Sequence, residues 1–214
     1  VQEPKTVPVA YYPTNQTWQH IINDPSEPIV ITEGELKPAK SCKEGFPTVG
    51  LGGVYNWRSL GGCISWLPSL DYVVWLRRKV YIVFDSDYQS NENVCTALKQ
   101  LASQLHDLGA FVYLVTLPTL EDFDKVGLDD FLTFAGPTYI DMFNQLLFEA
   151  VPLGLTSILW EFNKKYVYVQ DPGLIMNQVT RTKTSPSAFK DHLESTTTYQ
   201  EKQVGPEGKI CYKA

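Results

Sequence analysis

Acidic residues follow two short apolar runs of this 214-residue chain, at the point where each run ends. Glu33 ends the run Ile29–Thr32, and Asp85 and Asp87 come directly after Val80–Phe84. Runs of this kind are typical of buried strands in a parallel sheet, and ligands bind where such strands end. Carboxylates gathered at one edge repel one another unless a cation lies between them, and Mg²⁺ is the usual oxygen-liganded ion at phosphate sites. The pattern therefore predicts a metal-carboxylate site, with Mg²⁺ as the cofactor and Mn²⁺ as its substitute.

A further acidic position follows the next predicted strand, in the segment Gly127–Phe131. We expect Asp129 to lie near the metal site as a further ligand, and we interpret Asp130 as a structural residue at the start of the next helix. A lone acid after a strand usually caps a helix or lies in a solvated turn, so Glu33 alone would not indicate a function. Its occurrence together with the Asp-x-Asp pair favours the metal site.

Glycines and basic residues near these strands are candidates for phosphate binding. The cluster Gly50–Gly53 is not a phosphate loop, because no Gly-Lys-Ser/Thr follows it and the last glycine of a dinucleotide fingerprint is missing. We expect its glycines, Gly52 and Gly53 included, to allow close backbone approach to a neighbouring strand or to a substrate phosphate. Lys37 and Arg58 are expected to contact a phosphate near the carboxylates.

Two other segments have two interpretations each. The aromatic residues between Tyr55 and Trp75 either stack on unpaired bases or form a packed core. The basic run Arg77–Lys79 is either a phosphate-binding patch or a solvated turn, and we favour the turn.

Composition limits the class of protein. Hydrophobic residues make up 43% of the chain, which is enough for a packed core. No apolar run is long enough to span a bilayer and the N-terminus lacks a signal-peptide pattern, so we expect a cytoplasmic protein with no membrane partner. The four cysteines are widely spaced, which predicts reduced thiols rather than a zinc site or a disulfide framework. A net charge of −6 predicts modest affinity for duplex DNA of any sequence, and the missing initiator methionine predicts a fragment.

Strands and helices are expected to alternate along the chain. The predicted strands are 29–32, 48–53, 80–84 and 111–117, and the predicted helices are 36–45, 91–109, 128–134 and 139–150. This order predicts an α/β fold with a short, Rossmann-like parallel sheet flanked by helices. We expect three parts: an N-terminal arm over 1–27, the α/β domain over 28–150, and an extension or interdomain connector over 151–214. In the last part, 157–162 and 165–169 are expected to be short helical or extended pieces, and 187–194 a short helix.

Three motifs together resemble the Toprim fold, which bacterial-type primases, topoisomerases and several nucleases share: Thr32-Glu33-Gly34-Glu35, Asp85-Ser86-Asp87 and Gly127-Leu128-Asp129-Asp130. More narrowly, EGELKPAK, GLGGVYNWR and KVGLDDFL are similar to uncharacterised Toprim-like domains of plasmid, phage and cyanobacterial-type mobile-element replication proteins. The resemblance covers about residues 28–135. It implies that Glu33 is a general acid or base and that Asp85 and Asp87 bind Mg²⁺. Lys37 departs from the pattern, because many Toprim enzymes have an acid there.

The resemblance implies Mg²⁺-dependent phosphoryl transfer on nucleic acid, as primer synthesis or strand nicking, with Glu33 and Lys37 in the catalytic roles. The implied partners are nucleic acid, DNA in preference to RNA and including single strands, and primase or helicase domains of the same or a partner chain. One alternative is a non-catalytic module that binds metal or nucleic acid and positions a neighbouring primase or helicase. Another is a sugar-nucleotide transferase, which also uses Asp-x-Asp with a divalent metal, although the GLDDF segment argues against it.

Overall fold

The computed structural model describes residues 8–59, 65–121, 123–136, 138–154, 165–196, 202–204 and 210–212. The chain forms two compact units, residues 1–156 and 157–214. None of the helices in the described ranges is long and apolar enough to cross a membrane. The domain boundaries expected after residues 27 and 150 stay predictions.

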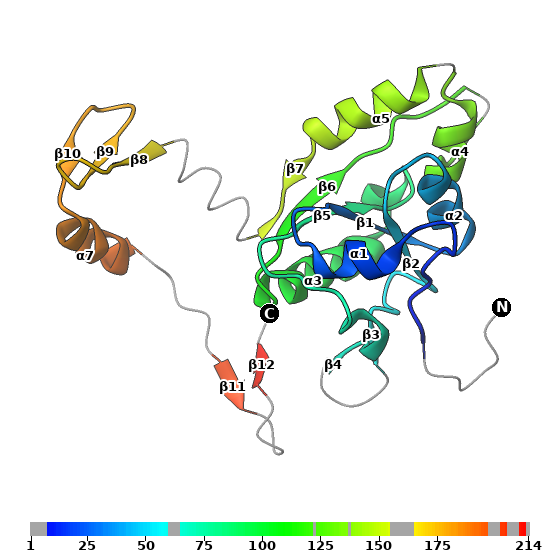
Figure 1. The fold of residues 1–214 in the computed structure, drawn as a ribbon, viewed down its shortest axis with the longest axis horizontal. Helices are drawn as coiled ribbons and strands as arrows, with labels where there is room; N and C mark the ends of the chain where they lie inside the picture. The colour runs from blue at the N-terminus through cyan, green and yellow to red at the C-terminus, as the bar shows by residue number, and fades with distance from the viewer. Residues whose placement is uncertain are drawn as a thin grey trace. The chain divides into compact units, whose positions relative to one another are not determined.

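The first unit is built on a five-stranded sheet with the strand order β2-β1-β5-β6-β7 (Figure 1). Its strands are β1 (Ile29–Glu33), β2 (Thr48–Leu51), β5 (Lys79–Val83), β6 (Phe111–Val115) and β7 (Val151–Pro152). Strand β1 runs parallel to β2 and β5, and β5 runs parallel to β6, whereas β7 at the edge is antiparallel to β6. The predicted α/β fold with a parallel sheet is confirmed, and the four parallel strands end at one edge.

Helices connect these strands and lie on both faces of the sheet (Figure 1). They are α1 (Trp18–Asn23), α2 (Leu36–Lys43), α3 (Glu92–Asp107), α4 (Leu128–Phe134) and α5 (Tyr139–Phe148). Shorter elements are the pair β3 (Arg58–Ser59) and β4 (Ser65–Trp66) and the 3₁₀ turns η1 (Pro68–Leu70) and η2 (Tyr88–Ser90). The predicted helix 128–134 has the observed bounds, and α1 was not predicted.

Successive side chains of the central strands enter two separate hydrophobic cores. Ile31 of β1 and Ile82 of β5 pack in a core that includes residues of α1 and α3. Val30 of β1 and Val83 of β5 pack in a second core with residues of α4 and α5. Because both faces of these strands are buried, the strands read as continuous apolar runs in the sequence.

The aromatic segment after β2 belongs to the first core. Trp57 and Trp75 are 0% and 4% exposed, and Trp66 packs against both, with ring centroids 6.3 Å and 5.8 Å away. The packed-core interpretation is therefore confirmed for these tryptophans. Tyr72, in contrast, is exposed.

The solvated turn that we expected at Arg77–Lys79 is wrong for Arg78. Its side chain is fully buried, and its guanidinium donates hydrogen bonds to backbone carbonyl oxygens of four residues. The neighbouring Arg77 is exposed and has a φ of 62°. A buried guanidinium with these partners is structural, so the phosphate-patch alternative is also wrong for Arg78.

The described residues of the second unit include an antiparallel sheet with the order β10-β9-β8 and the helix α7. These elements are β8 (Tyr166–Val169), β9 (Leu174–Asn177), β10 (Lys183–Thr184) and α7 (Pro186–Thr196), and β11 (Lys202–Val204) pairs with β12 (Ile210–Tyr212). Phe189 of α7 is buried and its ring lies 4.7 Å from that of Tyr166. The short helix expected over 187–194 is confirmed, whereas the piece expected over 157–162 lies outside the described residues.

Candidate functional site

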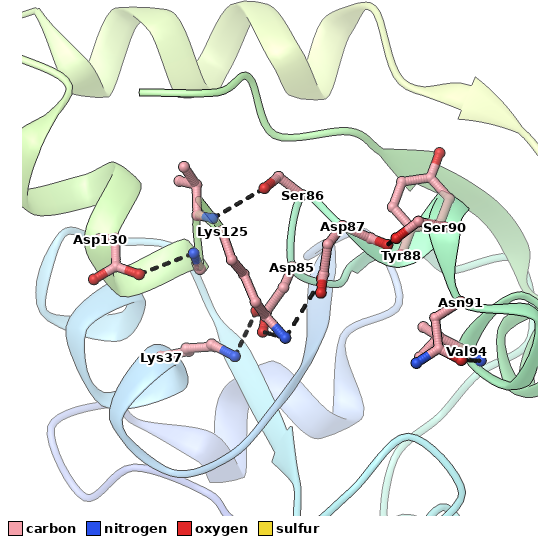
Figure 2. A network of polar contacts seen from close by, with 12 residues as sticks. Lys37, Asp85, Ser86, Asp87, Tyr88, Ser90, Asn91, Val94, Lys125 and Asp130 are labelled. Carbon is pink, nitrogen blue, oxygen red and sulfur yellow. Dashed lines mark hydrogen bonds and ion pairs between the residues drawn. The ribbon is translucent and has the colours of Figure 1, made fainter. Parts of the chain in front are cut away.

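Two lysines from different segments converge on Asp85, which follows β5 at the carboxyl edge of the sheet (Figure 2). The Nζ of Lys37, in the first turn of α2, lies 2.5 Å from Asp85 Oδ1, and the Nζ of Lys125, in the loop between β6 and α4, lies 2.9 Å from Oδ2. The side chains of Asp85 and Lys37 are 12% and 17% exposed, whereas that of Lys125 is 52% exposed. The structure thus brings the predicted Lys37 to the predicted Asp85 and adds Lys125.

Lys125 also connects the two members of the Asp-x-Asp pair. Its Nζ lies 3.4 Å from Asp87 Oδ1, so one ammonium group bridges both carboxylates. The hydrogen bond to Asp85, together with the negative charges of Asp85 and Asp87, raises the pKa of Lys125 above its usual value. Two lysines and two aspartates therefore form a cluster whose formal charges cancel. We call these four residues the carboxylate–lysine cluster.

One oxygen of the cluster lacks a hydrogen bond. Asp85 Oδ1 is buried and is contacted by the Lys37 ammonium, but this contact does not have the angles of a hydrogen bond. Asp85 Oδ1 is therefore balanced by the charge of Lys37, whereas Oδ2 is held by Lys125.

The loop that carries Lys125 is fixed by Ser86, the residue between the two aspartates. The Val126 N–H donates to Ser86 Oγ at 2.9 Å, which is the dashed line at Ser86 in Figure 2. The Ser86 backbone N–H donates in turn to the Val126 carbonyl at 2.9 Å. Because this reciprocal pair joins the neighbours of Asp85 and Lys125, it holds the ammonium beside the carboxylate.

Gly127 begins the next turn, where the acidic motif lies. Its N–H donates to Asp130 Oδ2 at 3.0 Å, so Asp130 caps α4 from inside its first turn, as its expected structural role requires. A Cβ at position 127 would lie 2.8 Å from both Asp129 Oδ1 and Lys37 Cε. Asp129 is therefore beside the Lys37 side chain, near the cluster, although no ion pair in the described part of the chain joins it to Asp85 or Asp87.

Glu33 lies at the same edge of the sheet, at the end of β1. Strand β5 is a neighbour of β1, and Ile31 of β1 pairs with Ile82 of β5. In this register Glu33 lies opposite Phe84, the residue just before Asp85. Glu33 is partly buried, and its carboxylate forms no ion pair with another described residue. Its catalytic role stays a prediction.

The other predicted phosphate-binding residues are not joined to the cluster by any hydrogen bond or ion pair of the described residues. The Arg58 guanidinium stacks 4.6 Å from the ring centroid of Tyr55, whose hydroxyl donates to the Asn93 carbonyl. Gly52 is exposed in the turn after β2, and a Cβ at Gly53 would make only ordinary contacts.

A close backbone approach occurs instead at the first glycine of that cluster. A Cβ at Gly50 would lie 2.2 Å from the carbonyl oxygen of Gly34, in the turn that follows Glu33. The expected close approach is therefore present at Gly50, where it allows the turn after β1 to pack against β2.

The carboxylates of this site can hold a divalent metal only in small number. Within the described residues, no group of three or more His, Cys, Asp or Glu side chains could hold a metal ion. Mg²⁺ at phosphate sites, however, is often held by one or two carboxylates, with water and phosphate oxygens completing its shell. Asp85 and Asp87 already share one cationic group, the Lys125 ammonium, which contacts Asp85 Oδ2 and Asp87 Oδ1. The pair therefore fits one ion of this kind, whereas the structure does not bring Glu33 or Asp129 to it as further ligands.

Lys125 and Ser86 were missed by the sequence interpretation. Lys125 lies two residues before Gly127, within the KVGLDDFL motif, so the motif contained the signal. A lysine in a loop has no periodicity, and its partner Asp85 is 40 residues away; only the folded sheet brings the two together.

Comparisons with known proteins place the chain in a family. The crystal structure of the Aquifex aeolicus primase (zinc-binding and RNA polymerase domains) is similar, with 20% identity and a TM-score of 0.39 over 63% of this chain and 28% of that chain. This distant likeness carries no argument about activity, and no curated protein sequence matches the chain. The model of DUF3854, a domain of unknown function, matches residues 17–139, which is more than half of the chain and includes the whole carboxylate–lysine cluster. This chain therefore belongs to the DUF3854 family.

Proposed function

We propose that this domain binds a nucleic-acid phosphate together with one divalent cation at Asp85 and Asp87, and that it catalyses phosphoryl transfer there, as primer synthesis or strand nicking. The observation that carries the proposal is the single ammonium shared by the two carboxylates at the carboxyl edge of a parallel sheet. Ligands of open α/β sheets bind at this edge, and two carboxylates that accept one cation can accept Mg²⁺ or Mn²⁺.

Each residue of the site has a role that its position allows. When bound, the metal supplies neutralisation of the negative charge that develops on the transferred phosphate. Lys37 is largely buried beside Asp85 and holds a phosphate oxygen as a point charge. Glu33, at the end of β1, accepts the proton of the attacking hydroxyl or water as its oxygen bonds to phosphorus and the bond from phosphorus to the leaving oxygen breaks.

The resemblance of the three acidic motifs to Toprim domains supports this proposal. It extends the proposal to a replication protein of mobile elements, in which neighbouring primase or helicase domains would deliver DNA or RNA to the site. The family match spans residues 17–139 and so contains all of the motifs on which the proposal rests.

One observation favours a second candidate, a non-catalytic module that binds nucleic acid and positions a neighbouring enzyme. The charges of the carboxylate–lysine cluster cancel, so Asp85 and Asp87 already have cationic partners without a metal. Such a module would bind a phosphate through Lys37 and Lys125 and would show no turnover.

Calorimetry with Mg²⁺ and Mn²⁺ tests the first proposal, with nicking and primer-synthesis assays on the same samples. We expect the wild-type chain to bind metal in the presence of a single-stranded DNA oligonucleotide, and the D85N/D87N variant to lose at least tenfold in affinity. Metal binding with turnover supports the enzyme, and metal binding without turnover supports the module. Absence of binding by the wild type, with and without the oligonucleotide, contradicts the metal site.

Glu33→Gln separates the two candidates further. The enzyme should lose most of its turnover in this variant, by about 10²–10⁴-fold, while metal affinity changes little. Glu35→Gln is the matched control, because Glu35 is an exposed glutamate two residues away. Equal turnover in the two variants would remove Glu33 from the proton transfer.

A further inference from the structure

We propose that Lys125 is an exchangeable internal cation, which holds Asp85 and Asp87 together until a divalent cation displaces it and then pairs with the incoming phosphate. The inference rests on the proposed function, because it concerns the same metal and phosphate. It adds a residue that regulates when the metal binds and couples metal binding to substrate binding.

The first argument is that Lys125 and the metal need the same oxygen atoms. The Lys125 ammonium takes Asp85 Oδ2 and Asp87 Oδ1, the two groups that the Asp-x-Asp pair can offer to one ion. Both cations cannot lie between the same two carboxylates, so one must leave when the other binds.

The second argument is the charge of the site. Lys37, Lys125, Asp85 and Asp87 are formally neutral together, so a divalent cation alone would leave an excess of two positive charges. A phosphate offers the negative charge that compensates this excess and gives the released ammonium a new partner. Metal and phosphate should therefore increase each other's affinity, and the coupling must be reciprocal.

The third argument identifies which of the two lysines is exchangeable. Lys125 is 52% exposed, whereas Lys37 is 17% exposed and packs against the backbone of Gly127, because a Cβ built on Gly127 would be only 2.8 Å from Lys37 Cε. Exposed ion pairs are weak and their side chains move freely. Lys125 can therefore leave at little cost, while Lys37 keeps its place beside Asp85.

The fourth argument is that the loop stays in place when the ammonium leaves. The reciprocal hydrogen bonds between Ser86 and Val126 do not involve any atom of the carboxylate–lysine cluster. They fix the backbone next to Lys125 in either state, so the released ammonium remains within one side-chain length of the site.

Calorimetry on the full chain tests the competition, with Mn²⁺ titrated into the wild type, Lys125→Gln and Lys99→Gln. Lys99 is the matched control, because it is an exposed lysine of α3 outside the cluster. Without DNA, we expect Lys125→Gln to bind Mn²⁺ about 3- to 10-fold more tightly than the wild type. A single-stranded DNA oligonucleotide with a 5′-phosphate should tighten Mn²⁺ binding in the wild type and in Lys99→Gln, and less so in Lys125→Gln.

Acetylation of lysines by an N-hydroxysuccinimide ester, read by mass spectrometry, tests the release itself. Saturating Mg²⁺ without DNA should increase the labelling rate of Lys125 about threefold or more, because the amine loses its hydrogen bond to Asp85, and it should leave Lys99 unchanged. Removing the positive charge of Lys125 could by itself raise the Mn²⁺ affinity of Lys125→Gln. The labelling is measured on wild-type Lys125, where no charge is removed, so it is specific to the exchange.

The outcomes separate the inference from the proposed function. Equal Mn²⁺ affinity of the wild type and Lys125→Gln, or Lys125 labelling that does not respond to Mg²⁺, overturns the exchange but leaves the metal site intact. No metal binding by any of the three proteins, with or without the oligonucleotide, overturns the proposed function and the exchange together.

Discussion

Strand β5 has a cation-binding arrangement at each end, and the two are built differently. At its amino end, the Arg78 guanidinium is fully buried and its acceptors are backbone carbonyl oxygens. At its carboxyl end, Lys37 and Lys125 are partly exposed and their partners are the carboxylates of Asp85 and Asp87. At one end a fully buried cation has uncharged acceptors, whereas at the other end the acceptors are charged and Lys125 and Asp87 are partly exposed to solvent.

The amino end holds short elements together. Arg78 donates to the Val74 carbonyl at 2.7 Å and the Glu27 carbonyl at 2.6 Å, and one nitrogen lies 3.0 Å from both the Ile21 and Ile22 carbonyls. The last two belong to α1, a helix of six residues that is too short to be stable alone. Its final carbonyl oxygens have no partner within the helix, and the guanidinium supplies the missing donors.

The comparison separates a structural cation from a functional one. A metal or phosphate cannot replace Arg78, because the Arg78 side chain is fully buried and its acceptors carry no charge. At the carboxyl end, the half-exposed Lys125 contributes little to stability and another cation can satisfy the same carboxylates, as the exchange that we propose requires. Burial and the type of acceptor, rather than the presence of a cation, therefore distinguish the two ends of β5.

The largest effect is expected from Arg78→Met. This variant removes the donors that the guanidinium gives to four backbone carbonyl oxygens, although the Ile22 carbonyl still accepts from the Val74 N–H at 2.9 Å. We expect the free energy of unfolding to fall by about 3–5 kcal/mol. Urea denaturation followed by tryptophan fluorescence measures this loss, since Trp57 and Trp75 lie in the core that α1 covers.

Arg78→Lys is the matched control, because it keeps the charge but cannot reach four acceptors at once. Its loss should be intermediate. If Arg78→Met were as stable as the wild type, the contrast between the two ends of β5 would be wrong.

Alkaline pH should have the next largest effect, through a buried thiol and through Lys125, whereas Arg78 keeps its proton. Cys42 of α2 is buried, and burial raises the pKa of its thiol to about 11 from an ordinary value of 9.0. Between these values the unfolded thiol ionises and the folded one does not, so stability present below pH 9 falls as the pH rises to about 11, by on the order of 1–3 kcal/mol.

The contribution of Lys125 to stability also falls as the pH rises. Its ion pairs are present below the ordinary lysine pKa and are lost as the pH rises through its raised pKa. Urea denaturation at pH 8, 9, 10 and 11 measures the decline, and Cys42→Ala should make it less steep. An equally steep decline in Cys42→Ala would assign the alkaline loss to other groups.

Much of the fold could be predicted from the sequence. The buried parallel strands appear as continuous apolar runs, and Gly45 and Gly109, with φ of 92° and 83°, end the helices that precede them. The strand ends could also be predicted, and with them the common edge that carries Glu33, Asp85 and Asp87. These features depend on local composition, which is why sequence patterns report them.

The contacts between distant segments could not be predicted. Arg78 follows another basic residue and reads as a solvated turn, but its acceptors come from α1 and from the turn after it. In the sequence, Lys125 cannot be distinguished from other loop lysines. It lies near Asp85 because the strands that precede the two residues, β6 and β5, pair in the sheet. Helix α1 was missed because six residues carry little periodicity and Arg78 satisfies the end of the helix from outside.

Gly127→Ala should have a smaller effect on stability and a specific effect on the carboxyl end. Its Cβ would lie 2.8 Å from Lys37 Cε and Asp129 Oδ1, which are ends of flexible side chains that can move away. We therefore expect a loss of about 1 kcal/mol, with Lys37 displaced from Asp85 and acetylated faster. Gly53→Ala is the matched control, because its Cβ would meet only Asn56 at 3.6 Å, and it should change neither quantity.

The smallest effect on stability is expected from Lys125→Met, the counterpart of Arg78→Met at the other end of β5. Its ammonium is half-exposed, and Lys37 still balances part of the charge of Asp85, so the free energy of unfolding should change by no more than about 0.5 kcal/mol. The same urea denaturation at pH 7 measures both variants, which places the two ends of one strand on one scale. A loss above about 1 kcal/mol would mean that the ammonium holds the structure as Arg78 does. A cation with that role could not be released to a phosphate, so this measurement also limits the exchange that we propose.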